Sequence, residues 1–336
     1  MSGYNLYDYA KQFMPDGKEF PIVRELDKND PIIRDAVVKE SNSDSGHEYA
    51  VQNGLPAVVW RRAYEGVKPT KGSTTVVKET FGRMSAVSMV DVAIAEKGGK
   101  VKEIRAEMMR DRLESMAQEA ASKIIYGSLA ENEKAFVGFA KRYGKLSGAK
   151  TSDNVINNGG TTANKQSSIY LIGWAPNKIF TFFPKGTRAG IKTYDYSANG
   201  PIDLPDGEGG TFPGYKEQAE WLLGLGVQDW RYGARVCNIE LSTLTTDDAQ
   251  KKLYNNFMKA VGQIHNLENC KLVAYASRHV KDALRLGYMK SGCVTVFQNN
   301  NMTSSGNQGY ANHDLIIDGI HIKAEDAIVE TEAVVA

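Results

Sequence analysis

The chain has 336 residues, a length that suits one large domain or two of ordinary size. Its formal net charge of +1 excludes recruitment of nucleic acid or of an anionic membrane by a global field. No apolar run approaches the roughly 18 residues of a membrane helix, and the N-terminus lacks the basic and apolar regions of a secretory signal. The cysteines are too few and too widely spaced for a disulfide framework or a zinc cluster, so we expect buried, reduced thiols at Cys237, Cys270 and Cys293.

Residues 1–50 are predicted to form an extended arm with short helical pieces. Prolines interrupt this arm, and Pro31 suits the first turn of a short helix over residues 31–38. The polar stretch 41–46 is typical of a loop.

A basic segment with a β-strand pattern runs from about Gly54 to Gly99. Residues 55–64 and 74–81 alternate in character around a Gly/Pro/Lys-rich tip, which predicts a long hairpin. An isolated hairpin is marginally stable in water, and this segment has too little apolar content for a core of its own. We therefore expect it to be stabilised by contact with another copy of the chain.

The strongest helical pattern follows directly, from about Val101 to Tyr126. Its apolar residues recur at helical spacing, and Gly127 can cap the end. Such a helix spans about 40 Å and is expected to act as a spine.

The remaining chain predicts a mixture of strands and helices. Strands are expected at 168–174, 179–183, 221–226, 235–239 and 271–275, with a final pair within 315–322 in which Asp318-Gly319 forms either a turn or a bulge. Helices are expected at about 246–264 and 278–289.

Motifs for catalysis are scarce. The phosphate-binding P-loop and the GxSxG nucleophile motif are both absent from the sequence. His47-Glu48 begins like a zinc-protease helix, but Val51 stands where the second histidine is needed. Asp203, Asp206 and Glu208 share a glycine-rich loop without the spacing of a calcium loop. A metal-dependent hydrolase using these residues is a distant alternative, and we assign no catalytic, cofactor-binding or metal-binding residue.

Charge is distributed unevenly along the N-terminal part. Residues 61–83 carry six basic and two acidic side chains, a net of +4, whereas residues 19–48 carry four basic and eight acidic ones, a net of −4. Either the two segments are separately solvated, or the basic segment of one subunit lies over the acidic segment of another. An exposed ion pair contributes only about 0–1 kcal/mol, but many copies multiply the effect.

The order of these elements is similar to that of a known family. An arm precedes LPAVVWRR at residues 55–62, and a hairpin tip, SAVSMVD at residues 85–91 and the long helix follow. This order resembles the major capsid proteins of tailed bacteriophages with the Hong Kong 97-type fold, especially those of epsilon15-like short-tailed phages. The resemblance implies an α+β fold divided into an N-terminal arm (1–50), an extended loop (51–99), a peripheral domain with the spine helix (100–165), an axial domain (166–300) and C-terminal strands that return to the peripheral or axial sheet (301–336).

The resemblance also implies a non-enzymatic protein. Its copies would assemble as hexamers and pentamers into an icosahedral virion shell around double-stranded DNA, held on the inner face without sequence specificity. It would be made in the host bacterial cytoplasm and would work with a portal and a cement or decoration protein. Because residues 1–50 lack sustained heptads, we expect a separate scaffold or none. An encapsulin-type nanocompartment shell is the nearer alternative.

Two sets of residues are predicted to join subunits. Apolar contacts are expected from Trp60, Tyr64, Val76 and Phe81, and a charged register from Arg61, Arg62, Lys68 and Lys71. The founding family member cross-links a Lys to an Asn. Lys68 or Lys71 with Asn299, Asn300 or Asn301 are the corresponding candidates, although lysines at a hairpin tip more often maintain solubility.

Overall fold

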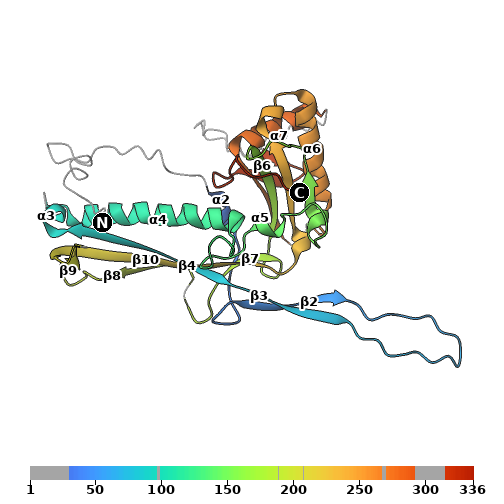
Figure 1. Ribbon diagram of the computed structural model, residues 1–336, viewed down its shortest axis with the longest axis horizontal. Helices are drawn as coiled ribbons and strands as arrows, with labels where there is room; N and C mark the ends of the chain where they lie inside the picture. Colours follow the sequence, from blue (N-terminus) through green and yellow to red (C-terminus); the bar gives the residue numbers. More distant parts are fainter. Residues whose placement is uncertain (1–29, 97–98, 188, 207, 267–269, 292–314) are drawn as a thin grey trace, which may run out of the picture.

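The computed structural model describes residues 30–96, 99–187, 189–206, 208–266, 270–291 and 315–336. The molecule is elongated (Figure 1). A long helix lies along two long strands at one end, a compact domain stands at the other, and a two-stranded ribbon projects beyond that domain.

Six α-helices occur among the described residues. They are α2 (Pro31–Asp35), α3 (Val92–Ala95), α4 (Val101–Tyr126), α5 (Phe139–Arg142), α6 (Asp247–Gly262) and α7 (Arg278–Lys290). Short 3-10 turns are η2 (Ser152–Asn154), η3 (Trp230–Tyr232) and η4 (Leu241–Thr243).

Most strands belong to one sheet whose main path is β13-β14-β12-β6-β7-β10-β4. Its members are β1 (Val38–Glu40), β4 (Phe81–Asp91), β5 (Val155–Asn157), β6 (Gln166–Trp174), β7 (Ile179–Phe183), β8 (Ile191–Asp195), β9 (Ile202–Pro205), β10 (Thr211–Val227), β11 (Gly233–Glu240), β12 (Lys271–Ala276), β13 (Leu315–Ile317) and β14 (Ile320–Ala324). The ribbon is a separate pair, β2 (His47–Gly54) and β3 (Ser73–Glu79).

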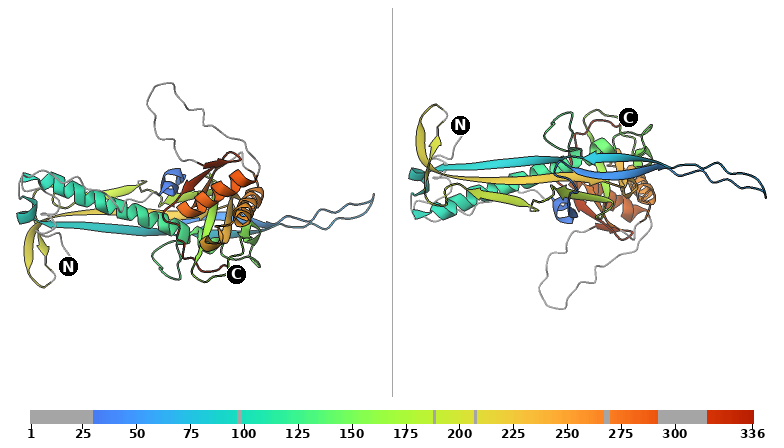
Figure 2. Two further views of the ribbon diagram at one scale, coloured as in Figure 1. Left: turned by 90° about the horizontal axis from the view of Figure 1, so that it is seen from above. Right: turned by 90° about the horizontal axis from the view of Figure 1, so that it is seen from below.

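Helix α4 has the bounds that its sequence pattern predicts, so that prediction is confirmed. Its buried side chains, among them Ile104, Met108 and Ile124, face β4 and β10. Views from above and below show both strands running alongside it (Figure 2). The helix ends at Gly127, whose amide donates to the Lys123 carbonyl.

Strand β4 corrects the expectation that residues 54–99 are stabilised only by another copy. It pairs antiparallel with β10 from Phe81↔Gly224 to Asp91↔Gly214. Val90 in β4 and Ala95 in α3 also bury their side chains against α4. The part of the segment that forms β4 and α3 has few apolar residues. These are sufficient because β10 and α4 supply the rest of the core.

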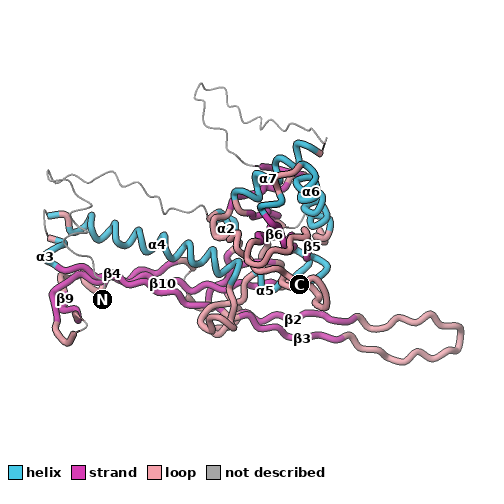
Figure 3. Tube along the Cα trace, turned by 45° about the horizontal axis from the view of Figure 1, so that its top comes forward, coloured by secondary structure: helices cyan, strands magenta, loops and turns pink. Residues whose placement is uncertain are grey.

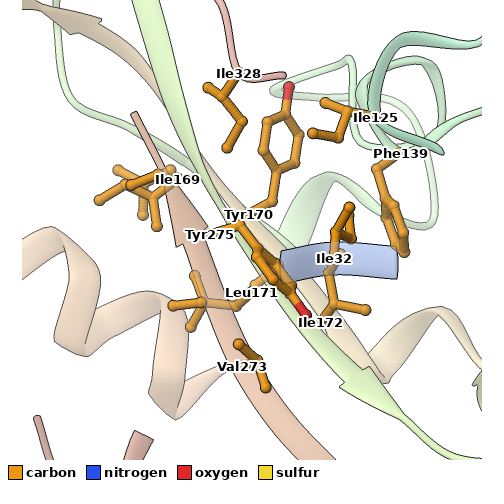
Figure 4. Close-up of a cluster of buried hydrophobic side chains, with 14 of the residues drawn as sticks. Ile32, Ile125, Phe139, Ile169, Tyr170, Leu171, Ile172, Val273, Tyr275 and Ile328 are labelled. Carbon is orange, nitrogen blue, oxygen red and sulfur yellow. The ribbon is translucent and has the colours of Figure 1, made fainter. Parts of the chain in front are cut away.

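The compact domain is built around β6, whose nine residues are all buried. Strands β11 and β12 flank it, and α6 and α7 pack beside it. The two helices begin at Thr246 and Ser277, whose hydroxyls accept hydrogen bonds from the amides of Ala249 and Val280. The core extends to the other helices, since Figure 4 shows side chains of α2, α4 and α5 gathered around the central strands: Ile32, Ile125, Phe139, Tyr170, Ile172 and Tyr275.

The C-terminal strand pair is also confirmed. Asp318 and Gly319 have φ values of 52° and 76°, and both values are positive, as a two-residue hairpin turn between β13 and β14 requires. Strand β14 then pairs parallel with β12 and enters the main sheet. The helices and strands predicted between residues 166 and 290 are present, with 221–226 forming part of the longer β10.

Two predicted elements are wrong. Residues 55–64 form no strand, because β3 pairs instead with β2, and residues 55–72 connect the two. The side chains of residues 55–64 alternate in character, but neither face of this segment is buried, since the side chains on both faces are exposed. The helix expected to reach Val38 stops at Asp35, where Ala36 turns extended with ψ 130° and Val38 begins a strand paired parallel with β7.

Of the cysteines, Cys237 is buried and Cys270 half-buried, both free, and Cys293 lies outside the described residues. Burial raises the pKa of the Cys237 thiol to about 11. In the described part of the chain, no helix is long and apolar enough to cross a membrane.

Candidate assembly surface

The surface with the least support from its own chain is the ribbon, defined here as residues 47–79. Its outer part, residues 55–72, is called the tip. Figure 3 shows the strands leaving the body and the tip continuing as a long open loop. Near the outer end of β2, the Lys150 ammonium donates to Asn53 Oδ1 at 2.6 Å.

The tip exposes an unusual amount of apolar surface. Trp60 is 98% exposed and Val58 92% exposed, and Leu55 and Tyr64 are similarly open. Val76, on β3 below the tip, is 68% exposed. Contiguous apolar groups of this size mark interaction surfaces in soluble proteins.

Local hydrogen bonds give the tip a definite shape. Arg62 and Glu65 close a turn through their backbone at 3.2 Å, and the Glu65 carboxylate accepts from the Arg62 amide at 2.9 Å. Tyr64 has φ 68° in this turn, a left-handed conformation that usually favours glycine. Across the tip, the Thr70 hydroxyl donates to the Ala57 carbonyl at 2.9 Å. The tip therefore holds its aromatic groups outward on an ordered loop.

The charged side chains predicted for subunit contact lie on the same tip. Arg61, Arg62, Lys68 and Lys71 are all exposed, and Glu65 is the single acidic residue beside them, giving a local net of +3. Of the predicted contact residues, Trp60, Arg61, Arg62, Tyr64, Lys68 and Lys71 lie on the tip, whereas Val76 lies on β3 and Phe81 on β4. Phe81 is half-buried in β4 opposite Gly224, inside the main sheet.

Sequence reasoning missed the root of the ribbon, the place where it joins the body. Glu79, the last residue of β3, is buried, and both of its carboxylate oxygens accept from Arg142 of α5 at 2.6 and 2.7 Å. The Tyr49 hydroxyl lies 3.0 Å from the same carboxylate and 2.7 Å from the Val227 carbonyl, so it can donate to either acceptor. Burial disfavours the charge on Arg142, but Glu79 outweighs it, so the pKa of Arg142 is raised.

The backbone at the root is equally tight. Gly46 has φ 155°, and a Cβ there would collide with the Glu79 carbonyl. No sequence motif links Glu79 to Arg142, which lies far along the chain on another element. Only the fold reveals this contact.

The residues considered for metal chemistry have other roles. The His47 ring lies against Phe180 and Phe182, and Glu48 forms a 3.2 Å ion pair with Lys78. The Asp206 carboxylate accepts from the amides of Glu208 and Gly210, and these hydrogen bonds lower the pKa of Asp206. Within the described ranges, no group of three His, Cys, Asp or Glu side chains could hold a metal ion.

Comparison with known proteins accounts for a fold built on a spine helix with a projecting ribbon. The family model for the major capsid protein GP7 matches residues 14–336. The chain belongs to this major capsid protein family. No curated protein sequence matches it.

The solved structure of bacteriophage epsilon15 agrees with that family, and two further shell structures are more distantly similar. The chain is 25% identical to the bacteriophage epsilon15 structure, with a TM-score of 0.76 and coverage of 100% of this chain and 98% of that one. The bacteriophage JBD30 capsid aligns at 9% identity and a TM-score of 0.48, covering 81% of this chain and 90% of that one. The SrpI encapsulin of Synechococcus elongatus aligns at 10% identity and a TM-score of 0.45, covering 69% and 94%.

The expected family and fold class are therefore confirmed. The protein is a major capsid protein with a mixed helix and sheet fold like that of phage capsids. Neither the nanocompartment shell nor the metal-dependent hydrolase is favoured. The candidate cross-link partners Asn299, Asn300 and Asn301 lie outside the described residues.

Proposed function

We propose that this capsid protein builds an icosahedral phage head from hexamers and pentamers, and that the ribbon of each copy lies on a neighbouring copy. The observation that carries the proposal is the exposed apolar and basic tip. A subunit gains little from holding Trp60 and Tyr64 in water on an ordered loop. Placed on a neighbour, the same side chains bury large apolar areas at low conformational cost.

Repetition turns such contacts into a stable shell. Each copy both gives a ribbon and receives one, so modest contacts close into a network. The tip charges Arg61, Arg62, Lys68 and Lys71 contribute register and steering more than affinity.

The proposed division of the chain follows the family, with one adjustment at the ribbon. The N-terminal arm leads to the ribbon at residues 47–79, which serves as the extended loop. Residues 80–165 would form the peripheral domain with α4, joined by β8, β9 and the part of β10 that pairs with β4. The rest of residues 166–300 would form the axial domain, and residues 301–336 would return strands to the sheet. Axial domains would meet around the symmetry axes of hexamers and pentamers.

The remaining partners follow from the role of a phage head. We propose that double-stranded DNA lies against the inner face without sequence recognition, since the net charge of +1 offers no strong attraction. A portal, a separate scaffold and a cement or decoration protein would complete the particle, which is made in the bacterial cytoplasm.

The apolar contact is tested by the double substitution Trp60→Ala and Tyr64→Ala. Both side chains are exposed, so the subunit should fold and unfold as the unchanged protein does, while shell yield in negative-stain images falls at least about tenfold. Thr74→Ala, at an exposed position on the same ribbon, is the matched control and should assemble normally. Normal shells from the double variant would refute the ribbon contact.

The charged register is tested separately by Lys68→Glu with Lys71→Glu. This change makes the tip net negative and should slow assembly most at low salt, where charges are least screened. Light scattering over a range of salt concentrations measures the effect. Assembly rates and shell melting temperatures equal to those of the unchanged protein would remove these lysines from the contact.

A further inference from the structure

The root of the ribbon contains a buried histidine, His47, which takes no part in the Glu79–Arg142 ion pair. His47 is the first residue of β2 and stands directly opposite Glu79, the last paired residue of β3. The two side chains are only 5% and 7% exposed. This cross-strand pair is therefore the last buried layer before the ribbon leaves the body.

The His47 ring sits in an aromatic environment. Its centroid is 5.2 Å from Phe180, edge to face, and 5.7 Å from Phe182, with Tyr49 at 6.2 Å. Its Nδ1 atom is buried and has no hydrogen-bond partner among the described residues. A neutral imidazole is tolerated in such a site, whereas a charged imidazolium would lose its hydration without a compensating acceptor.

The charged groups around His47 do not favour its protonation. Lys39 of β1 holds its ammonium 5.1 Å from the centroid of the Phe180 ring, on the same aromatic cluster. Glu79 is the nearest carboxylate, but Arg142 occupies both of its oxygens and Tyr49 contacts one of them. Burial, with Lys39 as a second cause, lowers the pKa of His47 more than Glu79 raises it.

We propose that His47 makes the root a proton-sensitive latch, which fixes the direction of the ribbon while the imidazole is neutral and loosens when it is protonated. In a loosened root the imidazole would be solvated and would titrate near its usual value of about 6.5. Protons therefore bind the loosened form more readily than the fastened one.

The sign of the pH dependence follows. The equilibrium constant for the fastened over the loosened root is largest above about pH 6.5. It falls by up to about tenfold for each pH unit of acidification until the lower pKa of the buried imidazole is reached. The Arg142–Glu79 ion pair holds the same end of the ribbon and resists the change. If ribbons join neighbouring copies as proposed above, mild acid weakens that contact by misdirecting the ribbon.

The primary test follows the full-length protein in its dissociated form. Exchange of the histidine C2 hydrogen, read by mass spectrometry, reports the pKa of His47 directly, and the exposed His279 serves as an internal reference. We expect His47 to titrate below 6.5. A value at or above 6.5 would overturn the proposal.

A second measurement follows the ribbon itself. We measure protection against backbone hydrogen exchange, corrected for the intrinsic pH dependence of exchange. The protection factors of residues 46–54 and 73–82 should fall at least about tenfold between pH 7.5 and pH 5. Residues 166–174 of the buried β6 should not change. Equal behaviour of all three peptides would contradict a local latch.

The matched variants are His47→Phe and His279→Phe. A phenylalanine fits the aromatic site and cannot titrate, so His47→Phe should keep its protection at pH 5, while His279→Phe should respond as the unchanged protein does. If His47→Phe loses protection in acid to the same extent, the latch lies elsewhere. Since these readouts need no shell, a failure of assembly with an intact latch would count against the proposed ribbon contact alone.

Discussion

Arg235 is a charge that the fold accommodates in its interior. It is 4% exposed and donates to Glu332 at 2.8 Å, to the Ser168 hydroxyl at 3.1 Å and to the Tyr143 carbonyl at 3.0 Å. Glu332 also accepts from the Tyr126 hydroxyl at the end of α4. The ion pair thereby fastens the C-terminal segment to the central sheet and to the spine helix.

Removing Arg235 should leave the charge of Glu332 buried without a counter-charge. We expect Arg235→Met to lower the free energy of unfolding by about 3–5 kcal/mol, because Glu332 stays buried without its counter-charge. Urea unfolding followed by circular dichroism measures the change. Arg278→Met is the control, since the Arg278 side chain is 64% exposed in its pair with Asp326, and this pair should contribute no more than about 1 kcal/mol. Equal losses in the two variants would contradict this account of the buried pair.

Glu325 presents the opposite case, a buried carboxyl with no ion pair to a cation among the residues that the structure describes. It is fully buried and accepts from the Ile32 amide at 3.0 Å, which ties the start of the described chain to the sheet. Burial, followed by the hydrogen bond and the charge of Asp30, raises the pKa of Glu325 to about 9. At neutral pH this side chain is therefore protonated in the folded protein and ionised in the unfolded one.

A raised carboxyl pKa makes stability fall with rising pH. The contribution of Glu325 is complete below its unfolded pKa of about 4.3 and declines until its folded pKa near 9 is reached. We expect Glu325→Gln to change little at pH 5 but to gain about 1–3 kcal/mol over the unchanged protein by pH 9. Unfolding curves at several pH values test this, with the exposed Glu131→Gln as control. Parallel pH profiles for Glu325→Gln and the unchanged protein would disprove it.

At the scale of elements, the regular helix α4 ends in an irregular junction with the segment that follows it. Its end passes within contact distance of the next segment, where Gly127 and Gly138 pair their backbones at 2.9 Å. A Cβ on Gly127 would collide with the carbonyls of Lys123 and Phe136. The spine can approach α5 this closely only because both positions lack side chains.

That junction supplies a prediction for Gly127. We expect Gly127→Ala to lower the free energy of unfolding by about 1–3 kcal/mol, since both colliding groups are backbone and cannot move aside cheaply. Gly262→Ala is the matched control, because nothing lies within 4 Å of its Cβ position and helix propensity favours alanine by up to about 1 kcal/mol. Thermal unfolding of the two variants should shift in opposite directions. A loss for both would mean that the space around Gly127 does not explain its role.

Elements also show what sequence can and cannot predict. The spine helix was predictable because its pattern is long and periodic and its ends are marked by glycines. The ribbon register was not, because the tip alternates in character without burying either face. The latch residues His47, Glu79 and Arg142 come from three separate elements, and only the tertiary fold places them together. The exposure of the tip residues was predictable, because the segment has too little apolar content to form a core that would bury them.

At the scale of the whole molecule, two extensions leave the compact domain in different directions. One carries α4 with β4 and β10, and the other carries the ribbon (Figure 1). The first is held by a buried core, whereas the second is held at its root and, beyond it, by the hydrogen bond from Lys150 to Asn53. The ribbon is thus the part of the described chain whose environment should change most when copies meet.

An extended basic loop in water is also a substrate for proteases. The tip offers trypsin the peptide bonds after Arg61, Arg62 and Lys71 on an open backbone. A newly made subunit is therefore vulnerable to cutting until a neighbour covers this loop. Limited trypsin digestion can therefore follow assembly over time, because the fraction of uncut chains reports the fraction of copies whose tip a neighbour already covers.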